Sequence, residues 1–83
     1  MSRPTSRGEL RLTGVVEAGV EAGCLILRPD SGSVYLLLGG DSTVLVPGRR
    51  VAVRGLPQPD RVTFCMQGIP FEVREATPIQ PVG

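Results

Sequence analysis

The sequence contains no histidine, lysine or tryptophan, and it has only one tyrosine and two phenylalanines. Histidine and lysine most often act as general bases or help to activate a nucleophile, so their absence argues against acid–base and nucleophilic catalysis. The two cysteines, Cys24 and Cys65, form no CxxC pair, whereas a zinc site needs about four ligands. We therefore predict that the protein is not an enzyme and that it holds no metal ion and no cofactor.

The chain also lacks an excess of either charge and a long apolar run. Nine basic residues, all arginine, nearly balance eight acidic residues, which leaves a formal net charge of +1. Such a chain has no strong field to attract nucleic acid or a membrane surface. The N-terminal stretch MSRPTSRGEL is polar, so we expect no signal peptide, no transmembrane segment, no membrane partner and a cytoplasmic location.

What the chain does contain is valine, leucine, glycine and proline. Its 83 residues suit one domain, and a hydrophobic fraction of 41% is enough for a compact core. Eleven glycines and eight prolines are spread along the chain and disfavour long helices. Valine in turn favours strands. The composition therefore predicts an all-β fold with an aliphatic core.

The first strand is predicted within the segment ELRLTGVVEAG, residues 9–19, because apolar residues occupy every second position. Gly14 lies inside this pattern and indicates a bend, as at the corner of a barrel. The unit Val-Glu-Ala-Gly then occurs twice, over 16–23. A helix there would carry two glycines in its interior, so we interpret the repeat as a turn, with Glu17 and Glu21 solvated on its rim.

Five further segments have the composition of strands, and turn residues separate them. They are predicted at 24–28, 34–38, 49–55, 61–66 and 70–76. The turn sequence PDSG predicts that the first two of these strands form a hairpin. Alternation points Val51 and Val53 inward in one later strand, and it places Phe71 and Val73 on one face of the last. Asp41 can cap at most one short helical turn, near 41–45.

This order predicts a small all-β barrel of five to six strands, an OB-fold-like Greek-key barrel over residues 9–78. An SH3-like barrel is the alternative. Residues 1–8 are expected to form a disordered N-terminal arm, and residues 79–83 a frayed C-terminal tail.

The sequence also resembles small uncharacterised bacterial proteins of the OB type. The resemblance rests on the framework GxVExGVExGC…L…YLLLGGD…LxPGxRVxVRG…PD…C…QG. The matching residues are Gly14, Val16, Glu17, Gly19 to Glu21, Gly23, Cys24, Tyr35 to Asp41, Pro47, Gly48, Arg50, Val51, Val53 to Gly55, Pro59, Asp60, Cys65, Gln67 and Gly68. The resemblance implies an OB-type barrel, and it implies no activity.

The two cysteines allow two interpretations. Cys24 lies on the second predicted strand and Cys65 on the fifth. In a cytoplasmic protein we expect them to be buried free thiols that act as small apolar side chains. The alternative is a disulfide between the two strands, which would stabilise so small a domain.

The arginines provide the candidate nucleic-acid contacts. On an OB-fold, they could line a groove for a phosphate backbone, with an aromatic side chain for base stacking. The set is Arg49, Arg50, Arg54, Arg61 and Tyr35. Phe64 and Phe71 are expected in the core, which leaves few stacking surfaces. A solvated face of mixed charge is the interpretation that we favour.

The sequence thus predicts a non-catalytic β-barrel binding or interaction module whose ligand is unknown. A protein or peptide partner is favoured, bound at a sheet edge or at the surface of residues 36–38. The alternative is a module that binds single-stranded nucleic acid. A third hypothesis is a homodimer that covers an edge strand.

Overall fold

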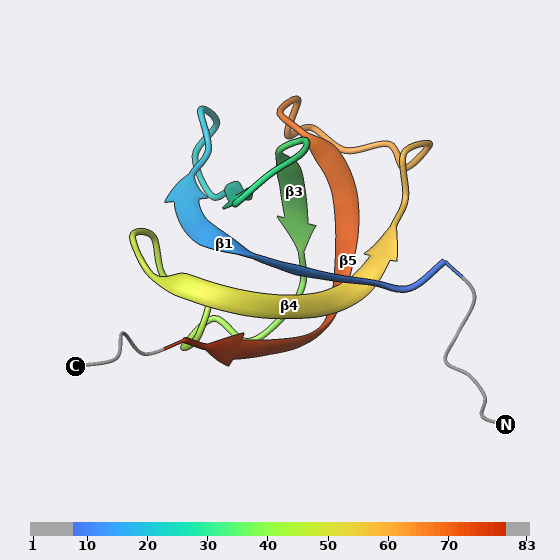
Figure 1. Cartoon of the computed structure of the whole chain (residues 1–83). Helices are drawn as coiled ribbons and strands as arrows, with labels where there is room; N and C mark the ends of the chain where they lie inside the picture. Colours follow the sequence, from blue (N-terminus) through green and yellow to red (C-terminus); the bar gives the residue numbers. More distant parts are fainter. Residues whose placement is uncertain (1–7, 80–83) are drawn as a thin grey trace, which may run out of the picture.

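The computed structural model describes residues 8–79. It contains five strands: β1 (Leu10–Ala18), β2 (Leu25–Pro29), β3 (Tyr35–Leu38), β4 (Arg50–Pro57) and β5 (Ile69–Pro78). They close into a barrel in the order β1-β2-β3-β5-β4, and the part of the chain that the structure describes contains no helix (Figure 1). The predicted all-β barrel is confirmed. Apart from Gly8 and Ile79, the predicted arm and tail lie outside the described residues.

The strand pairing is consistent with an OB-fold-like barrel. β1, β2 and β3 form an antiparallel meander, and β3 then pairs in parallel with β5. β1 is long enough to pair twice, through residues 14–18 with β2 and through residues 10–15 with β4. β1, β4 and β5 therefore curve strongly around the barrel (Figure 1).

Two glycines permit the close approaches that this curvature needs. Gly14 lies in β1 where its two pairings overlap, and a Cβ there would lie 2.2 Å from the carbonyl oxygen of Arg28. Gly55 lies at the irregularity in the β4–β5 pairing, where a Cβ would lie 1.9 Å from the carbonyl oxygen of Glu72. Neither position has room for a side chain, which accords with the bend expected at Gly14.

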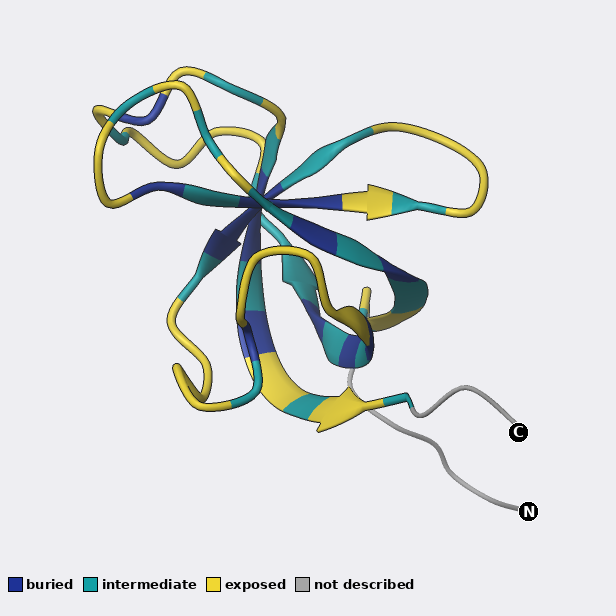
Figure 2. Ribbon diagram, turned by 90° about the vertical axis from the view of Figure 1, so that its left-hand side faces the viewer, coloured by how far each residue is buried: buried dark blue, intermediate teal, exposed yellow. Residues whose placement is uncertain are grey.

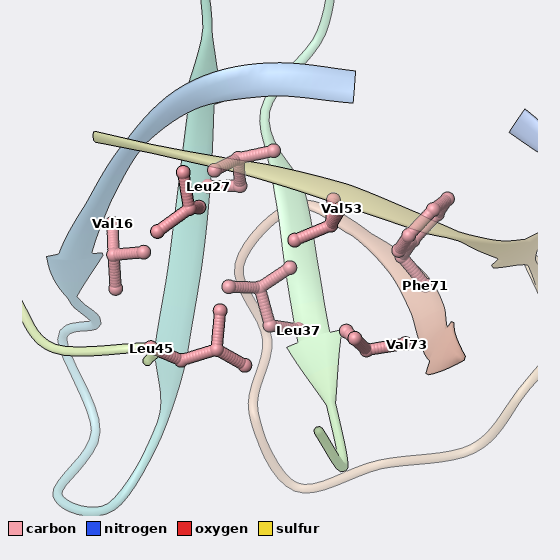
Figure 3. Packing of buried hydrophobic residues seen from close by; sticks show 8 residues of the cluster. Val16, Leu27, Leu37, Leu45, Val53, Phe71 and Val73 are labelled. Carbon is pink, nitrogen blue, oxygen red and sulfur yellow. The ribbon is translucent and has the colours of Figure 1, made fainter. Parts of the chain in front are cut away.

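The barrel interior is filled by aliphatic side chains around one aromatic ring. Every strand contributes, and Phe71 is fully buried. The inward orientation predicted for Val51, Val53 and Val73 is confirmed. The inner core consists of Val16, Leu27, Leu37, Leu45, Val51, Val53, Phe71 and Val73 (Figure 3).

A second apolar cluster lies on the other face of β2 and β3. It consists of Cys24, Ile26, Leu36 and Cys65, and we call it the outer cluster. Ile26 alternates along β2 with Leu27 of the inner core, and Leu36 alternates along β3 with Leu37. Both faces of these two strands are covered in this region, and residues 25–27 and 36–38 are accordingly apolar, whereas Arg28 of β2 is exposed.

The connections confirm one expectation and overturn another. The predicted turn near 41–45 is present: the Leu45 amide donates to the Asp41 carbonyl at 2.9 Å, and the Thr43 amide donates to the Asp41 carboxylate at 2.9 Å. The strand predicted at 61–66 is wrong, because this segment is an irregular connection between β4 and β5. The five described strands already close the barrel, so none of them has a free edge with which 61–66 could pair.

Candidate interaction surface on the loop before β5

The connection from β4 to β5, residues 58–68, carries the candidate site, and we call it the β4–β5 loop. It has no ladder partner. At its start Gln58 donates two hydrogen bonds to β5, from its amide to the Pro70 carbonyl at 2.7 Å and from its side chain to Glu72 at 3.0 Å. Three further contacts hold the rest of the loop to the barrel. Cys65 forms a disulfide with Cys24, at a Cα–Cα distance of 6.0 Å. The side-chain oxygen of Gln67 accepts a hydrogen bond at 2.9 Å from the amide of Val20, in the β1–β2 loop. At Ile69 the chain joins the ladder, where its amide donates to the Val34 carbonyl at 3.1 Å.

The disulfide decides between the two interpretations of the cysteines. Cys24 and Cys65 are bonded and nearly fully buried, and among the described residues neither cysteine is free. The free-thiol interpretation, which we favoured from the sequence, is therefore wrong for this structure. Both cysteines do lie in an apolar cluster, as that interpretation required. They come together because the β4–β5 loop folds over the outer face of β2. Neither cysteine lies on a strand as predicted, since Cys24 directly precedes β2 and Cys65 is in the loop.

The same loop exposes a row of large apolar side chains. Val62 is 95% exposed, Phe64 73% and Met66 80%. They alternate with Thr63, which is half-buried, and with Cys65, which is buried. We call Val62, Phe64 and Met66 the apolar row. Figure 2, in which exposed residues are yellow, shows that exposed residues are concentrated on the connections around the barrel.

Two neighbouring features extend this surface. Val20 is 83% exposed, and its amide hydrogen bond to Gln67 places it beside the end of the β4–β5 loop. A hollow of about 380 Å³ is lined by residues of the loop, among them Val62 and Met66, and by Pro70 of β5. A side chain of a partner could enter this hollow next to the apolar row.

The structure disperses the arginines predicted to contact nucleic acid. Arg49 precedes β4 and donates to the Thr43 carbonyl at 2.9 Å. Arg61 follows β4 and donates to the side-chain oxygen of Gln58. Since these two flank opposite ends of β4, they do not form a single groove with each other.

Arg50 and Arg54 lie on the outer side of β4, as predicted, but each is paired with acids. Arg50 binds the Asp30 carboxylate through two nitrogens, at 2.9 and 2.6 Å. Arg54 reaches Glu75 at 3.0 Å and Glu9 at 2.8 Å. These hydrogen bonds and charges raise the pKa of both arginines and lower that of Asp30. Their positive charge is largely neutralised within the chain.

Tyr35 lies away from these arginines. It is on β3, which pairs with β2 and β5 and not with β4. Its ring is half-buried and packs edge-on against Phe71, with the ring centroids 5.5 Å apart. Tyr35 thus contributes to the edge of the inner core, and the structure does not bring the predicted nucleic-acid set together.

The two acids of the repeated turn differ in environment. Glu17, at the end of β1, accepts hydrogen bonds from Arg28 at 2.9 and 3.2 Å, and these bonds lower the pKa of its carboxyl group. Glu21 is half-buried, and one of its carboxylate oxygens has no hydrogen-bond partner among the described residues. Glu17 is therefore an ion-paired strand residue rather than a free acid on a loop rim.

Sequence reasoning missed the apolar row because it placed Phe64 in the core. Phe71 is buried as expected, but Phe64 is exposed, so its predicted place in the core is wrong. The alternation of Val62, Phe64 and Met66 with Thr63 and Cys65 was visible in the sequence. This alternation alone does not show which of the two faces of the segment is buried.

Within residues 8–79, no three cysteine, histidine or acidic side chains come together as a metal site would require. No helix in this range is long and apolar enough to cross a membrane. No protein-family model matches the sequence, and no curated protein matches it either. The resemblance to bacterial proteins of the OB type stays a prediction.

Proposed function

We propose that the protein is a non-catalytic interaction module that binds an apolar peptide segment of another protein on its apolar row. The observation that carries this proposal is the exposure of Val62, Phe64 and Met66 together on one loop. Apolar surface exposed to water disfavours the free state by about 25 cal/mol per Å², so covering it favours association. Contiguous exposed apolar side chains are also typical of interaction sites.

The chemistry of the row suits a protein partner. Aromatic residues and methionine are enriched at the centres of protein interfaces, whereas charged residues are depleted there. The segment from Val62 to Gly68 carries no charged residue. An uncharged, apolar segment of the partner is therefore its natural complement.

The anchoring of the loop also supports binding. The Cys24–Cys65 disulfide fixes the centre of the row, and the hydrogen bond from Val20 to Gln67 fixes its end. A surface that is already ordered loses less conformational entropy when a partner binds. The loop can thus bind without a large ordering cost, although it has no ladder partner.

Single-stranded nucleic acid is the second candidate, and one observation favours it. Phe64 is an exposed aromatic ring on the loop that carries Arg61, and bases stack on such rings. The ion pairs of Arg50 and Arg54 weigh against it, because the positive charges of these arginines are already paired with acids of the same chain.

The test is a selection of random peptides displayed on phage, with the oxidised protein as the target. The best peptides are then measured against Phe64→Ser and a matched control, Val46→Ser, which alters an exposed valine before β4. We expect Phe64→Ser to weaken binding by about 2 kcal/mol, a roughly 30-fold increase in Kd, and Val46→Ser to leave Kd unchanged.

Three outcomes would contradict the proposal: no peptide is selected, both variants bind equally, or Phe64→Ser binds as the wild type does. A parallel titration with a 20-nucleotide oligothymidylate at two salt concentrations tests the second candidate. Salt-dependent binding that Phe64→Ser and Arg61→Gln both weaken would establish nucleic acid instead.

A further inference from the structure

The barrel and the β4–β5 loop are built as two separate units. Among the described residues, the loop contributes no side chain to the inner core, which consists of residues from the five strands and Leu45. The loop contributes Cys65 to the outer cluster, over Ile26 and Leu36. Displacing the loop would therefore leave every side chain of the inner core in place.

Few contacts besides the disulfide hold the second part of the loop, residues 62–68, to the barrel. For residues 62–68, the described structure contains one hydrogen bond to another part of the chain, the bond from Val20 to Gln67. The amide of Cys65 bonds only within the loop, to the hydroxyl of Thr63 at 3.1 Å. The covalent bond to Cys24 is thus the main restraint on the position of residues 62–68, whereas Gln58 at the start of the loop is held by hydrogen bonds to β5.

The disulfide also determines which way the apolar row faces. Cys65 lies between Phe64 and Met66, and its bond to Cys24 holds its side chain inward against Ile26. The neighbours on both sides must then point outward, as their exposure shows. Without the bond, the orientation of Cys65 is no longer fixed, so Phe64 and Met66 are no longer held together on one outward face.

From these observations we propose that the Cys24–Cys65 disulfide is a redox control on the interaction surface. The oxidised protein presents the apolar row, and reduction releases the β4–β5 loop and abolishes the surface while the barrel stays folded. The consequence for binding rests on the proposed function, whereas release of the loop does not.

The reductant is a dithiol, and the exchange balances. One thiolate of the dithiol attacks a sulfur of the Cys24–Cys65 bond, and the other cysteine leaves as a thiolate and takes up a proton. The second thiol of the reductant then attacks the mixed disulfide. Two electrons and two protons pass to the protein, which gains two thiols, and the reductant becomes a cyclic disulfide. Because both cysteines are nearly buried, a movement of the loop must precede the attack.

The test uses the full chain in two forms, the oxidised wild type and the wild type reduced with dithiothreitol. The variant Cys24→Ala/Cys65→Ala serves as a permanent mimic of the reduced state. Heteronuclear ¹⁵N NOE values report the order of residues 61–68, and amide chemical shifts report the five strands. We expect the NOE values of the loop to fall in the reduced protein and in the double variant, with the strand shifts retained away from Cys24.

A fluorescein-labelled peptide, selected on the oxidised protein, reports binding. We expect its Kd to rise at least tenfold on reduction, and dithiothreitol to have no further effect on the double variant. The inference is overturned if reduction unfolds the strands, if the loop keeps its NOE values, or if the peptide binds both redox forms equally. Failure of the proposed function shows differently, as equal binding of the peptide to oxidised wild type and oxidised Phe64→Ser.

Discussion

The two apolar clusters of this barrel are held together in different ways. The inner core has eight buried residues, and all five strands contribute to it. The outer cluster has four buried residues, two of which are joined as a disulfide. Hydrogen-bonded strands position every residue of the inner core except Leu45. A covalent bond holds an irregular loop over the outer cluster.

The comparison explains why this chain has a disulfide at that place. A closed barrel leaves no free strand edge, so a segment that lies over its outer face cannot be held by a backbone ladder. The β4–β5 loop instead depends on side-chain contacts and on Cys65. The loop is thus free of the geometry of the sheet and can expose apolar residues that a strand of the barrel would bury.

The largest effect is expected from the inner core. Phe71 is fully buried at the centre of this cluster, and Phe71→Ala should lower the free energy of unfolding by about 4 kcal/mol, because it removes a ring and leaves a cavity. Urea denaturation followed by circular dichroism measures this. The variant Phe64→Ala is the matched control, and we expect its stability to change by less than about 0.5 kcal/mol because the ring is exposed. Equal losses in the two variants would contradict the distinction between core and surface.

Removing the disulfide should have the next largest effect. Under oxidising conditions we expect Cys24→Ala/Cys65→Ala to lose about 3 kcal/mol, since the bond closes a loop with a sequence separation of 41 residues. The variant should still unfold in one cooperative step, because the inner core is intact. Dithiothreitol should bring the wild type to the stability of the variant. A variant that is unfolded at 25 °C would show that the barrel cannot form without the outer cluster.

The difference between the two clusters also separates what the sequence could predict from what it could not. Strand patterns at 9–19 and 49–55 located β1 and β4 to within a few residues, because period-two alternation directly reflects burial on one face. Segment 61–66 has the same alternation and is not a strand. Alternation reports that a segment is extended with two unlike faces, whereas a strand also needs a neighbour with a free edge. Whether such a free edge exists depends on how the whole barrel closes, and the sequence of the segment does not show it.

The prediction from the sequence missed the candidate site for the same reason. Assigning 61–66 to a strand placed Phe64 in the core, and it left a sheet edge, the surface of residues 36–38 and the arginines as candidate binding sites. Leu36 and Leu37 are in fact buried. The ion pairs that occupy Arg50 and Arg54 join residues distant in sequence, such as Asp30 and Glu75. Such pairs follow from strand register, which charge patterns alone do not give.

A smaller effect is expected at the second contact of the loop. Gln67→Ala removes the acceptor for the amide of Val20, and we expect a loss of about 0.5–1 kcal/mol because the bond is exposed and water can replace it. Thermal unfolding of the oxidised protein measures the loss. The same substitution in Cys24→Ala/Cys65→Ala should cost less, since the loop is already released. An equal cost in both backgrounds would show that the hydrogen bond holds the loop independently of the disulfide.

The smallest effect is expected from the ion pairs outside both clusters, which make the stability of the folded protein depend on pH. Hydrogen bonds from Arg50 hold the pKa of Asp30 below its ordinary value of 3.8. A carboxyl group with a lowered pKa in the folded state contributes stability that is fully present above its unfolded pKa, and this contribution is lost as the pH falls through the folded pKa. We therefore expect Asp30→Asn to show a shallower loss of stability below about pH 4 than the wild type. The pair is exposed, so the difference should be small and should shrink with added salt.

An NMR titration of the Asp30 carboxyl carbon measures the cause directly. In Arg50→Gln the pKa of Asp30 should rise toward 3.8. In Arg28→Gln, which breaks the separate pair with Glu17, the pKa of Asp30 should not change. An Asp30 pKa that is the same in wild type and Arg50→Gln would show that this ion pair does not persist in solution, and Arg50 would then be free to bind an external anion.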